Sequence, residues 1–273
     1  MIRYFMYITI TLCVSAVSQG QEAKLCHIAS AGFYATDGVN GVLLDALFGD
    51  GMDGYEVASD ELNKKMENAE GSFADVQLVF ASHFHEDHMT GKAILRHLRA
   101  NSKAVAVIPE QARTVLASSG IQPNDQAQVN SFKLPIGEQV IPKDMPFPVT
   151  LFGISHGEGK PIENIAITVT VAGKTIMHVG DMDAKEKDLR KAGVDKVAVD
   201  YLLMPFWYML SKESAAEINK IFDTKNIIPM HFTPDNTNWM QSMGGLEAVK
   251  QRSYSSAKNI VRLDEEMKCI LLK

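Results

Sequence analysis

Residues 82–88 read Ser-His-Phe-His-Glu-Asp-His, a stretch that holds three of the eight histidines of the chain. An apolar run over residues 76–81 (Val-Gln-Leu-Val-Phe-Ala) leads directly into this stretch, and a helical pattern follows it. His83 and His85 are two residues apart, so on an extended strand their side chains point the same way. The stretch therefore predicts two imidazoles that face one point at the end of a strand.

The donor atoms of this stretch match a metal site. Asp87 and His88 stand where the chain turns into the helix, which can bring both back toward His83 and His85. Three imidazoles and a carboxylate are nitrogen and oxygen ligands of the kind that zinc prefers. A polar surface loop is the alternative interpretation, but it does not explain why three histidines fall within six positions.

The composition indicates an ordinary globular protein. The chain has 273 residues, of which 46% are hydrophobic and 22% are charged, enough for a substantial core. The formal net charge is −6, the pI is about 5.8, and the sequence holds no block of like charges. A nucleic-acid partner is therefore not expected, and we expect a small-molecule substrate.

Residues 1–20 differ in character from the rest. Arg3 precedes an apolar run over residues 4–17, and the small residues Ala16 and Ser18 suit the −3 and −1 positions of a cleavage site. This is the layout of a secretory signal peptide. A membrane anchor is the alternative, but the run is shorter than the roughly 20 residues that a span needs.

We therefore expect a periplasmic or secreted protein with no stable membrane anchor after signal cleavage. Residues 21–273 are expected to form a single domain, since no repeat, low-complexity segment or flexible linker divides them. Cys13 follows a poor lipoprotein cleavage box, so lipidation is disfavoured. In an oxidising compartment Cys26 and Cys269 could close a disulfide, and two buried free thiols are an equally good interpretation.

Short apolar runs rich in Val and Ile predict many strands. They cover residues 25–33, 41–47, 76–82, 103–108, 148–154, 165–171, 175–179, 197–204, 226–230, 260–263 and 268–272. Helical patterns lie between some of them, at residues 59–69, from Thr90 onward, and at residues 111–118, 211–222 and 245–251. Interspersed strands and helices predict an α/β chain, and adjacent strands without a helix between them favour two mixed sheets.

The order His-x-His-x-Asp-His after an apolar strand resembles the signature of the metallo-β-lactamase superfamily. That resemblance implies an αββα sandwich of two mixed sheets, with metals bound along one edge between them. The other motifs of the family are expected at later strand ends, and the sequence has a matching residue at each. They are Asp45 in Leu-Leu-Asp, His156 in Ile-Ser-His-Gly, Asp181 in Val-Gly-Asp and His231 in Ile-Pro-Met-His.

The resemblance also implies a ligand set. His83, His85 and His156 would bind the first metal; Asp87, His88 and His231 would bind the second; Asp181 would bridge both. The implied cofactors are two Zn²⁺ ions, with Mn²⁺ or Fe²⁺ as alternatives, and the implied nucleophile is a hydroxide between them. Asp87 and Asp181 would be the catalytic residues, with Asp87 orienting the hydroxide and passing its proton to the leaving group.

Other residues have more than one interpretation. Asp45 fits either a carboxylate that fixes a ligand imidazole or a turn residue at a strand end. The remaining histidines (His27, His97 and His178) are expected to be structural. Residues 206–209, the turn with Lys160, and Asn164 are candidates to face the cleft, and residues 48–70 are the expected substrate loop.

We expect a hydrolase of a phosphoester or lactone. In the zinc β-lactamases the position of Asp181 is typically Cys or does not serve as a bridging ligand, so an Asp there is more similar to the phosphodiesterase, lactonase and thioesterase branches. The Leu-Leu-Asp-Ala-Leu stretch and the Ile-Pro-Met-His ending look most like the L-ascorbate-6-phosphate lactonase-like branch. A zinc β-lactamase, a mononuclear iron sulfur dioxygenase of the same fold and a metal-stabilised binding protein are the alternatives.

Overall fold

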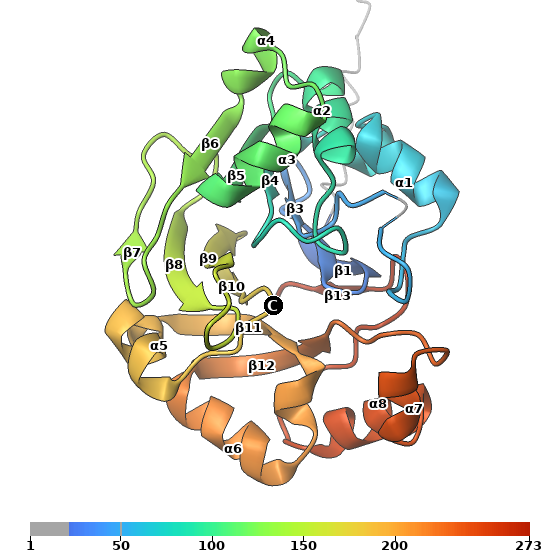
Figure 1. The fold of residues 1–273 in the computed structure, drawn as a ribbon, viewed down its shortest axis with the longest axis vertical. Coiled ribbons are helices and arrows are strands. Elements are labelled where there is room, and N and C mark those ends of the chain that lie inside the picture. Colours follow the sequence, from blue (N-terminus) through green and yellow to red (C-terminus); the bar gives the residue numbers. More distant parts are fainter. Residues whose placement is uncertain (1–21, 50) are drawn as a thin grey trace, which may run out of the picture.

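The computed structural model describes residues 22–49 and 51–273. The predicted signal peptide, residues 1–20, lies outside the described residues. Within the described part of the chain, no helix is long and apolar enough to cross a membrane. Figure 1 shows the strands in the middle of the molecule, with α1, α2 and α3 over one side and α5, α6 and α8 over the other.

The first sheet has the strand order β13-β1-β2-β3-β4-β5-β6. Its strands are β1 (Lys24–Ala29), β2 (Gly32–Thr36), β3 (Gly41–Leu44), β4 (Val76–Phe80), β5 (Val105–Pro109), β6 (Val129–Phe132) and β13 (Cys269–Leu271). Strands β3 to β6 run parallel, whereas β13, β1, β2 and β3 pair antiparallel. The sheet is therefore mixed, as predicted.

The second sheet has the order β12-β11-β10-β9-β8-β7 and is also mixed. Its strands are β7 (Gln139–Val140), β8 (Val149–Ser155), β9 (Glu163–Val171), β10 (Lys174–His178), β11 (Ala198–Pro205) and β12 (Asp223–Met230). Strands β10, β11 and β12 are parallel, and β7 to β10 pair antiparallel. Two mixed sheets flanked by helices confirm the predicted αββα sandwich.

The helices begin where the sequence supplies capping side chains. They are α1 (Asp60–Glu67), α2 (Gly91–Ala100), α3 (Arg113–Ser118), α4 (Pro123–Gln126), α5 (Glu186–Ala192), α6 (Lys212–Ile221), α7 (Asn238–Ser242) and α8 (Leu246–Ser255). The hydroxyl groups of Ser59, Thr90 and Ser211 accept hydrogen bonds from backbone N–H groups in the first turns of α1, α2 and α6. Short 3₁₀ turns cover Gly71–Phe73, Glu110–Ala112, Val194–Lys196 and Phe206–Met209.

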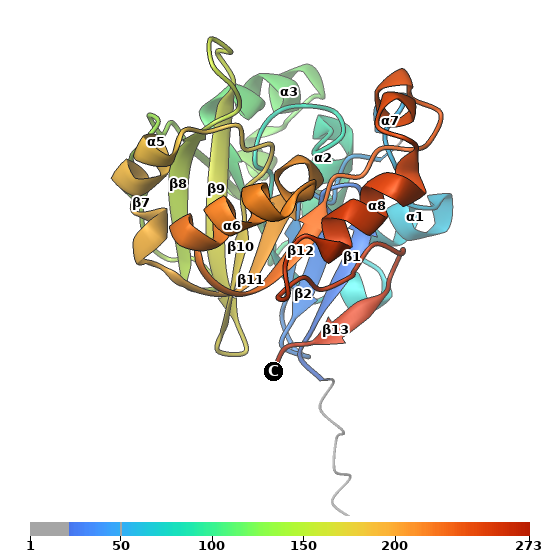
Figure 2. The same ribbon diagram turned by 90° about the horizontal axis from the view of Figure 1, so that it is seen from below.

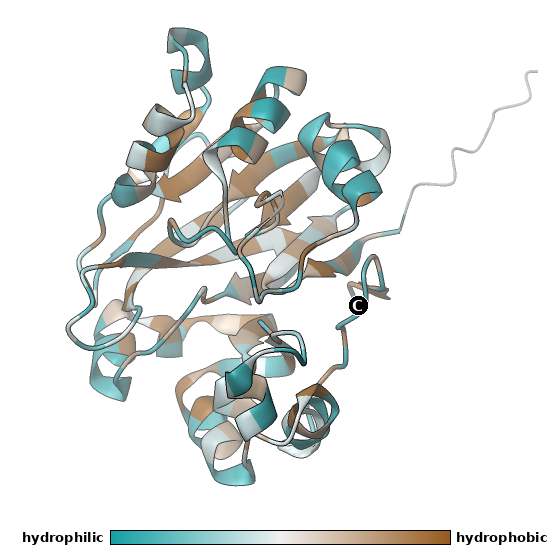
Figure 3. Ribbon diagram, turned by 45° about the vertical axis from the view of Figure 1, so that its right-hand side comes forward, coloured by the Kyte–Doolittle hydropathy of each residue, from teal (hydrophilic) through white to brown (hydrophobic). Residues whose placement is uncertain are grey.

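Alternation along the strands divides the core into layers. In β4, Leu78 and Phe80 belong to the cluster between the two sheets, while Val79 packs on the opposite face with residues of α1 and α2. Because parallel strands are covered on both faces, β3 and β4 are apolar almost throughout. Figure 3 shows this pattern as hydrophobic strands between helices with hydrophilic outer faces, and Figure 2 shows α6 lying across the second sheet.

Two strand predictions are wrong. The run at residues 25–33 is a hairpin, because Ser30 has a positive φ of 49° and turns the chain between β1 and β2. The run at residues 260–263 forms only an isolated bridge from Ile260 to Ile227. Several short elements (β6, β7, α4, α5 and α7) were not predicted, since they offer little hydrophobic periodicity.

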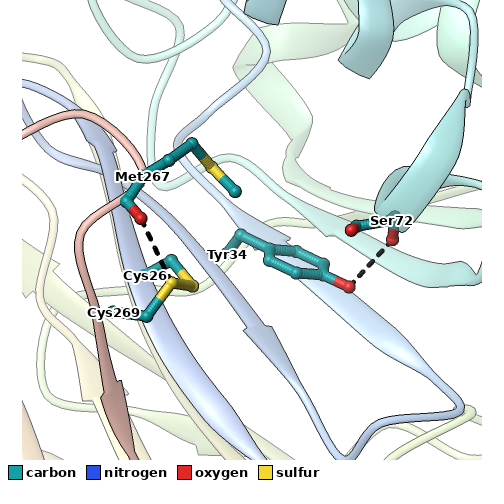
Figure 4. The surroundings of a disulfide bond; sticks show 5 residues. All are labelled: Cys26, Tyr34, Ser72, Met267 and Cys269. Atoms are coloured by element: carbon teal, nitrogen blue, oxygen red, sulfur yellow. Dashed lines mark hydrogen bonds between the residues drawn. A yellow bond between two sulfur atoms is a disulfide. The ribbon is translucent and has the colours of Figure 1, made fainter. Parts of the chain in front are cut away.

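Cys26 and Cys269 form a disulfide with an S–S distance of 1.98 Å (Figure 4). The two residues are register partners on β1 and β13, so the bond ties the last strand to the first across 243 positions of sequence. Of the two interpretations that the sequence left open, the structure has the disulfide.

Candidate metal centre

Five segments at one edge of the two sheets carry the candidate residues. Parallel strands present their carboxyl ends at one edge, and His156, Asp181 and His231 follow β8, β10 and β12, which run in the same direction. Asp45 follows β3, and the 82–88 stretch connects β4 to α2. Rigid strand ends therefore position the side chains predicted from sequence.

The first group contains His83, His85, His156 and Asp181, each with one donor atom within 4.8 Å of the others. The Nε2 atom of His83 lies 3.0 Å from Nδ1 of His85 and 3.3 Å from Nε2 of His156. Oδ2 of Asp181 lies 3.6 Å from Nε2 of His156 and 3.9 Å from Nε2 of His83. One carboxylate oxygen and three ring nitrogens thus converge.

The second group contains Asp87, His88, Asp181 and His231, again with donor atoms within 4.8 Å of one another. Oδ1 of Asp181 lies 3.1 Å from Nε2 of both His88 and His231. Oδ2 of Asp87 is 3.1 Å from Nε2 of His231, and the two Nε2 atoms are 3.1 Å apart. Asp181 belongs to both groups, with a different oxygen facing each.

The distances between the donor atoms match those between the ligands of a divalent cation. Ligand nitrogens around a tetrahedral ion at about 2.0–2.1 Å stand roughly 3.3 Å apart, which is the range of the nitrogen–nitrogen distances in both groups. Oδ1 of Asp87 and Oδ1 of Asp181 are buried and make no hydrogen bond within the described residues. Lone pairs that converge without enough protons are what a metal site requires.

The charges in the cluster also favour a bound cation. Burial favours the neutral form of Asp181, yet the charges of His231 and His88 hold its pKa well below the usual range. Burial lowers the pKa of His231, but Asp181 and Asp87 raise it to about 9. The buried carboxylates thus need positive charge beside them, which bound cations can supply.

A buried carboxylate and a hydroxyl contact the Nδ1 atoms of two candidate ligands, on the side of each ring away from the donor groups. Asp45 is fully buried, and its Oδ2 lies 2.7 Å from Nδ1 of His88. Asp45 also accepts hydrogen bonds from the N–H (2.6 Å) and the hydroxyl (2.5 Å) of Ser82. With a φ of 44°, Asp45 is both a strand-end turn residue and the partner of a predicted ligand, so both interpretations of this residue hold. Sequence reasoning missed Ser82, whose hydroxyl is also 2.9 Å from Nδ1 of His83.

The other histidines are structural, as expected. His97 is buried on α2, with its Nδ1 atom 2.6 Å from the carbonyl oxygen of Met66. His178 accepts a hydrogen bond from the N–H of Gly180 at Nδ1, and its Nε2 donates to the carbonyl of Ala31 at 2.8 Å. His27 is buried in β1, outside both groups.

Aromatic side chains border the second group. The Trp207 ring packs edge-on against His231 with a centroid distance of 5.3 Å, so this member of residues 206–209 faces the centre. Phe206 is instead buried in a separate apolar cluster. Tyr55, from residues 48–70, packs edge-on against the same His231 ring at 5.5 Å. No feature of the sequence singled out Tyr55.

A pocket of about 420 Å³ is lined in part by Gly157, Lys160 and Asp183, and none of the candidate ligands lines it. Lys160 is exposed at this pocket, and its place near the cleft stays a prediction. Asn164 is buried and donates a hydrogen bond to the carbonyl of Val179, two residues before Asp181.

Residues 40–232 match the family model of the beta-lactamase superfamily domain. This match spans more than half of the chain and includes Asp45 and every predicted ligand. The chain belongs to the metallo-β-lactamase superfamily. A search of curated protein sequences found no match to this chain. The matches do not single out the lactonase-like branch.

Solved structures share this superfamily member's fold at low sequence identity. A metallo hydrolase of the hyperthermophilic archaeon Ignicoccus hospitalis has a TM-score of 0.61 at 18% identity, covering 93% of this chain and 99% of that one. An isothiocyanate hydrolase from Delia radicum gut bacteria has a TM-score of 0.60 at 14% identity, covering 91% and 99%. A diiron β-hydroxylase of Streptomyces venezuelae has a TM-score of 0.57 at 13% identity, covering 92% and 54%. At these identities the similarity establishes the fold.

Family membership and the two His/Asp groups together support a metal-dependent hydrolase as the class of this protein.

Proposed function

We propose that this superfamily member is a dinuclear zinc hydrolase that acts on a phosphoester or lactone-type substrate. The observation that carries the proposal is the position of Asp181 between the two groups of donor atoms. One of its oxygens lies 3.1 Å from His88 and His231, and the other lies 3.6 Å from His156. A carboxylate whose two oxygens face different groups of donor atoms suits two cations that share it.

The residues of the chain have distinct tasks in this proposal. His83, His85 and His156 hold the first ion; Asp87, His88 and His231 hold the second; Asp181 holds both. Two divalent ions so held polarise a substrate oxygen and lower the pKa of water toward neutrality. Asp87 is our candidate for proton transfer from water to the leaving group, since its Oδ1 makes no hydrogen bond within the described residues.

The donor set is compatible with more than one metal. Imidazole and carboxylate ligands suit zinc, iron and manganese, so the residues do not select among them by chemistry alone. The similar fold of a diiron β-hydroxylase makes iron the alternative to test. Metal analysis of the purified protein decides this point, and we expect close to two zinc ions per chain.

The substrate class follows from where negative charge develops. A phosphoester or an opening lactone ring places that charge on oxygens that can lie between two cations. A β-lactam instead needs its departing nitrogen to be stabilised. We therefore expect hydrolysis of phosphoesters or lactones and little hydrolysis of β-lactams.

A panel of chromogenic phosphodiesters, esters, lactones and nitrocefin, assayed with metal analysis on the same preparation, tests the proposal. Turnover of a phosphodiester or lactone with two zinc ions per chain supports it. Efficient nitrocefin turnover with the other substrates inert would establish a zinc β-lactamase instead. One iron per chain with oxygen consumption on a persulfide would establish a sulfur dioxygenase.

We also infer that the protein is exported and that its leader is removed near residues 18–20. The apolar run at residues 4–17 and the Cys26–Cys269 disulfide both support export, because structural disulfides persist in oxidising compartments. Mass spectrometry of the exported protein tests this inference. An intact Met1 or a lipid-modified Cys13 would contradict it.

A further inference from the structure

Tyr55 brings an unpaired hydrogen-bond donor to the edge of the second group. Its ring stands almost perpendicular to the ring of His231, at an interplanar angle of 84°. Within the described residues, the hydroxyl of Tyr55 makes no hydrogen bond, whereas the hydroxyls of Tyr34 and Tyr201 donate to the carbonyls of Ser72 and Leu271. A Tyr hydroxyl is a hydrogen-bond donor, and one without a protein partner can donate to a ligand.

The ring contact places Tyr55 beside the centre. His231 belongs to the second group of donor atoms, so the phenol lies next to the residues that would hold the second ion.

Hydrogen bonds fix the segment that carries Tyr55. The carboxylate of Glu56 accepts a hydrogen bond from the N–H of Ser30 at 2.9 Å. The carbonyl of the same Ser30 accepts from the N–H of His231 at 3.0 Å. Only Ser30 therefore stands between the neighbour of Tyr55 and the backbone of the predicted ligand, which keeps the phenol at a set distance from His231.

Contacts on both sides of Tyr55 restrict the segment further. The N–H of Tyr55 donates to the carbonyl of Met52 at 3.1 Å, closing a turn around Gly54, which has a φ of 86°. Farther along, Glu266 accepts hydrogen bonds from the N–H and hydroxyl of Ser59 at 2.6 and 2.8 Å. A side chain anchored in this way is suited to binding, because little conformational freedom is lost when it meets a ligand.

The other aromatic residue beside His231, Trp207, does not offer a free hydrogen-bond donor within the described residues. Trp207 also packs against His231, but its indole N–H is directed to the carbonyl of Met182 at 3.4 Å. Lys160 lies at a pocket that none of the candidate ligands lines. Of these three side chains, Tyr55 is therefore the one that contacts the second group with a donor that has no partner within the described residues.

We propose that the hydroxyl of Tyr55 is a catalytic donor that binds the substrate oxygen on which negative charge develops beside Asp87 and His231. This inference rests on the proposed hydrolytic function and adds a residue to it. The competing explanation is that Tyr55 only packs against His231. Replacement by Phe separates the two, because Phe keeps the ring and removes the donor.

The first test measures binding of inorganic phosphate, a stable tetrahedral oxyanion, to the metal-loaded protein by calorimetry. We expect Tyr55→Phe to bind phosphate about tenfold or more weakly than the wild type, as expected for loss of a hydrogen bond to a charged acceptor. Tyr201→Phe is the matched control, since it removes a hydroxyl on β11. Equal affinity of the wild type and Tyr55→Phe, or no phosphate binding by the wild type, would overturn the proposal.

The second test measures turnover of whichever substrate the panel identifies. For Tyr55→Phe we expect kcat and kcat/KM to fall together by about 10- to 100-fold with KM nearly unchanged, the signature of a contact made in the transition state. Metal content should equal that of the wild type, and Tyr55→Ala should be no more active than Tyr55→Phe. A Phe variant with wild-type kcat would show that only packing matters. An inactive panel would contradict the proposed function, while phosphate binding would still decide the role of Tyr55.

Discussion

The Nδ1 atom of His88 lies 2.7 Å from the carboxylate of Asp45, and both residues are fully buried. Because Nδ1 donates to Asp45, Nε2 is the ring nitrogen that faces His231 and Asp181 and is left to bind a metal. The carboxylate thus sets both the tautomer and the orientation of the predicted ligand. Such partners commonly raise the metal affinity of an imidazole.

Asp45→Asn should weaken binding of the second metal by about 10- to 100-fold, because an amide cannot hold the ring by the same charge-assisted hydrogen bond. Titration of the metal-free protein with zinc against a chromogenic chelator measures this change. Asp75→Asn is the control, since Asp75 is exposed at the opposite end of β4 from the centre. Unchanged zinc affinity in Asp45→Asn would leave Asp45 as a turn residue alone.

Asp181→Ala should abolish the sharing of one carboxylate between the two groups. We expect loss of about one metal per chain and a fall in turnover of at least about a hundredfold, as removal of a metal-activated nucleophile should produce. Asp223→Ala, an exposed residue at the other end of β12 from His231, should retain metal and turnover. Near-normal activity of Asp181→Ala with full metal occupancy would refute its role.

Much of this centre was predictable because its residues follow strands. His83 and His85 lie in the bend just after β4, and the candidate ligands His156 and His231 directly follow β8 and β12. The hairpin at Ser30 was missed, since its turn is short, lies between two apolar runs and depends on a positive φ at a serine.

Contacts between residues far apart in the sequence could not be predicted from the pattern of apolar and polar residues. The role of Asp45 depends on His88, which lies 43 positions away in sequence. Tyr55 reaches His231 only because Glu56 and Ser30 bring their two segments together. Such pairs leave no periodicity in either segment, so the sequence alone could offer two interpretations of Asp45 and none of Tyr55.

Asp264 links pH to the stability of the fold. It is buried, and it lies 2.9 Å from Nζ of Lys250 and 3.1 Å from Nε of Arg262. Burial acts to raise the pKa of Asp264, but hydrogen bonds from Lys250 and Arg262 lower it overall. A carboxyl whose pKa is lower in the folded state stabilises the fold above its unfolded pKa, about 3.9, and loses that effect as the pH falls through the folded pKa.

Asp264→Asn should therefore lower the free energy of unfolding near neutral pH by about 1–2 kcal/mol, a modest value because Arg262 is half-exposed. The difference from the wild type should shrink as the pH falls below about 4. Urea denaturation at neutral and acidic pH measures both values. A difference that stays constant across this range would mean that the charge of Asp264 does not contribute.

The Cys26–Cys269 disulfide should contribute to stability through the unfolded chain. It closes a loop across 243 positions, so it restricts the unfolded ensemble strongly, and loss of a native disulfide commonly costs about 2–5 kcal/mol. We expect reduction to lower the midpoint of thermal unfolding and to loosen β13, whose pairing with β1 is short.

The doubly substituted variant Cys26→Ser, Cys269→Ser separates the disulfide from other effects of the reductant. Its unfolding midpoint should match that of the reduced wild type and should not change when reductant is added. The carboxyl end of β13 lies at the end of the first sheet opposite the centre, and the candidate ligands follow β4, β8, β10 and β12. Metal content at room temperature should therefore be the same in the variant and the wild type. A variant as stable as the oxidised wild type would show that β13 is held by strand pairing alone.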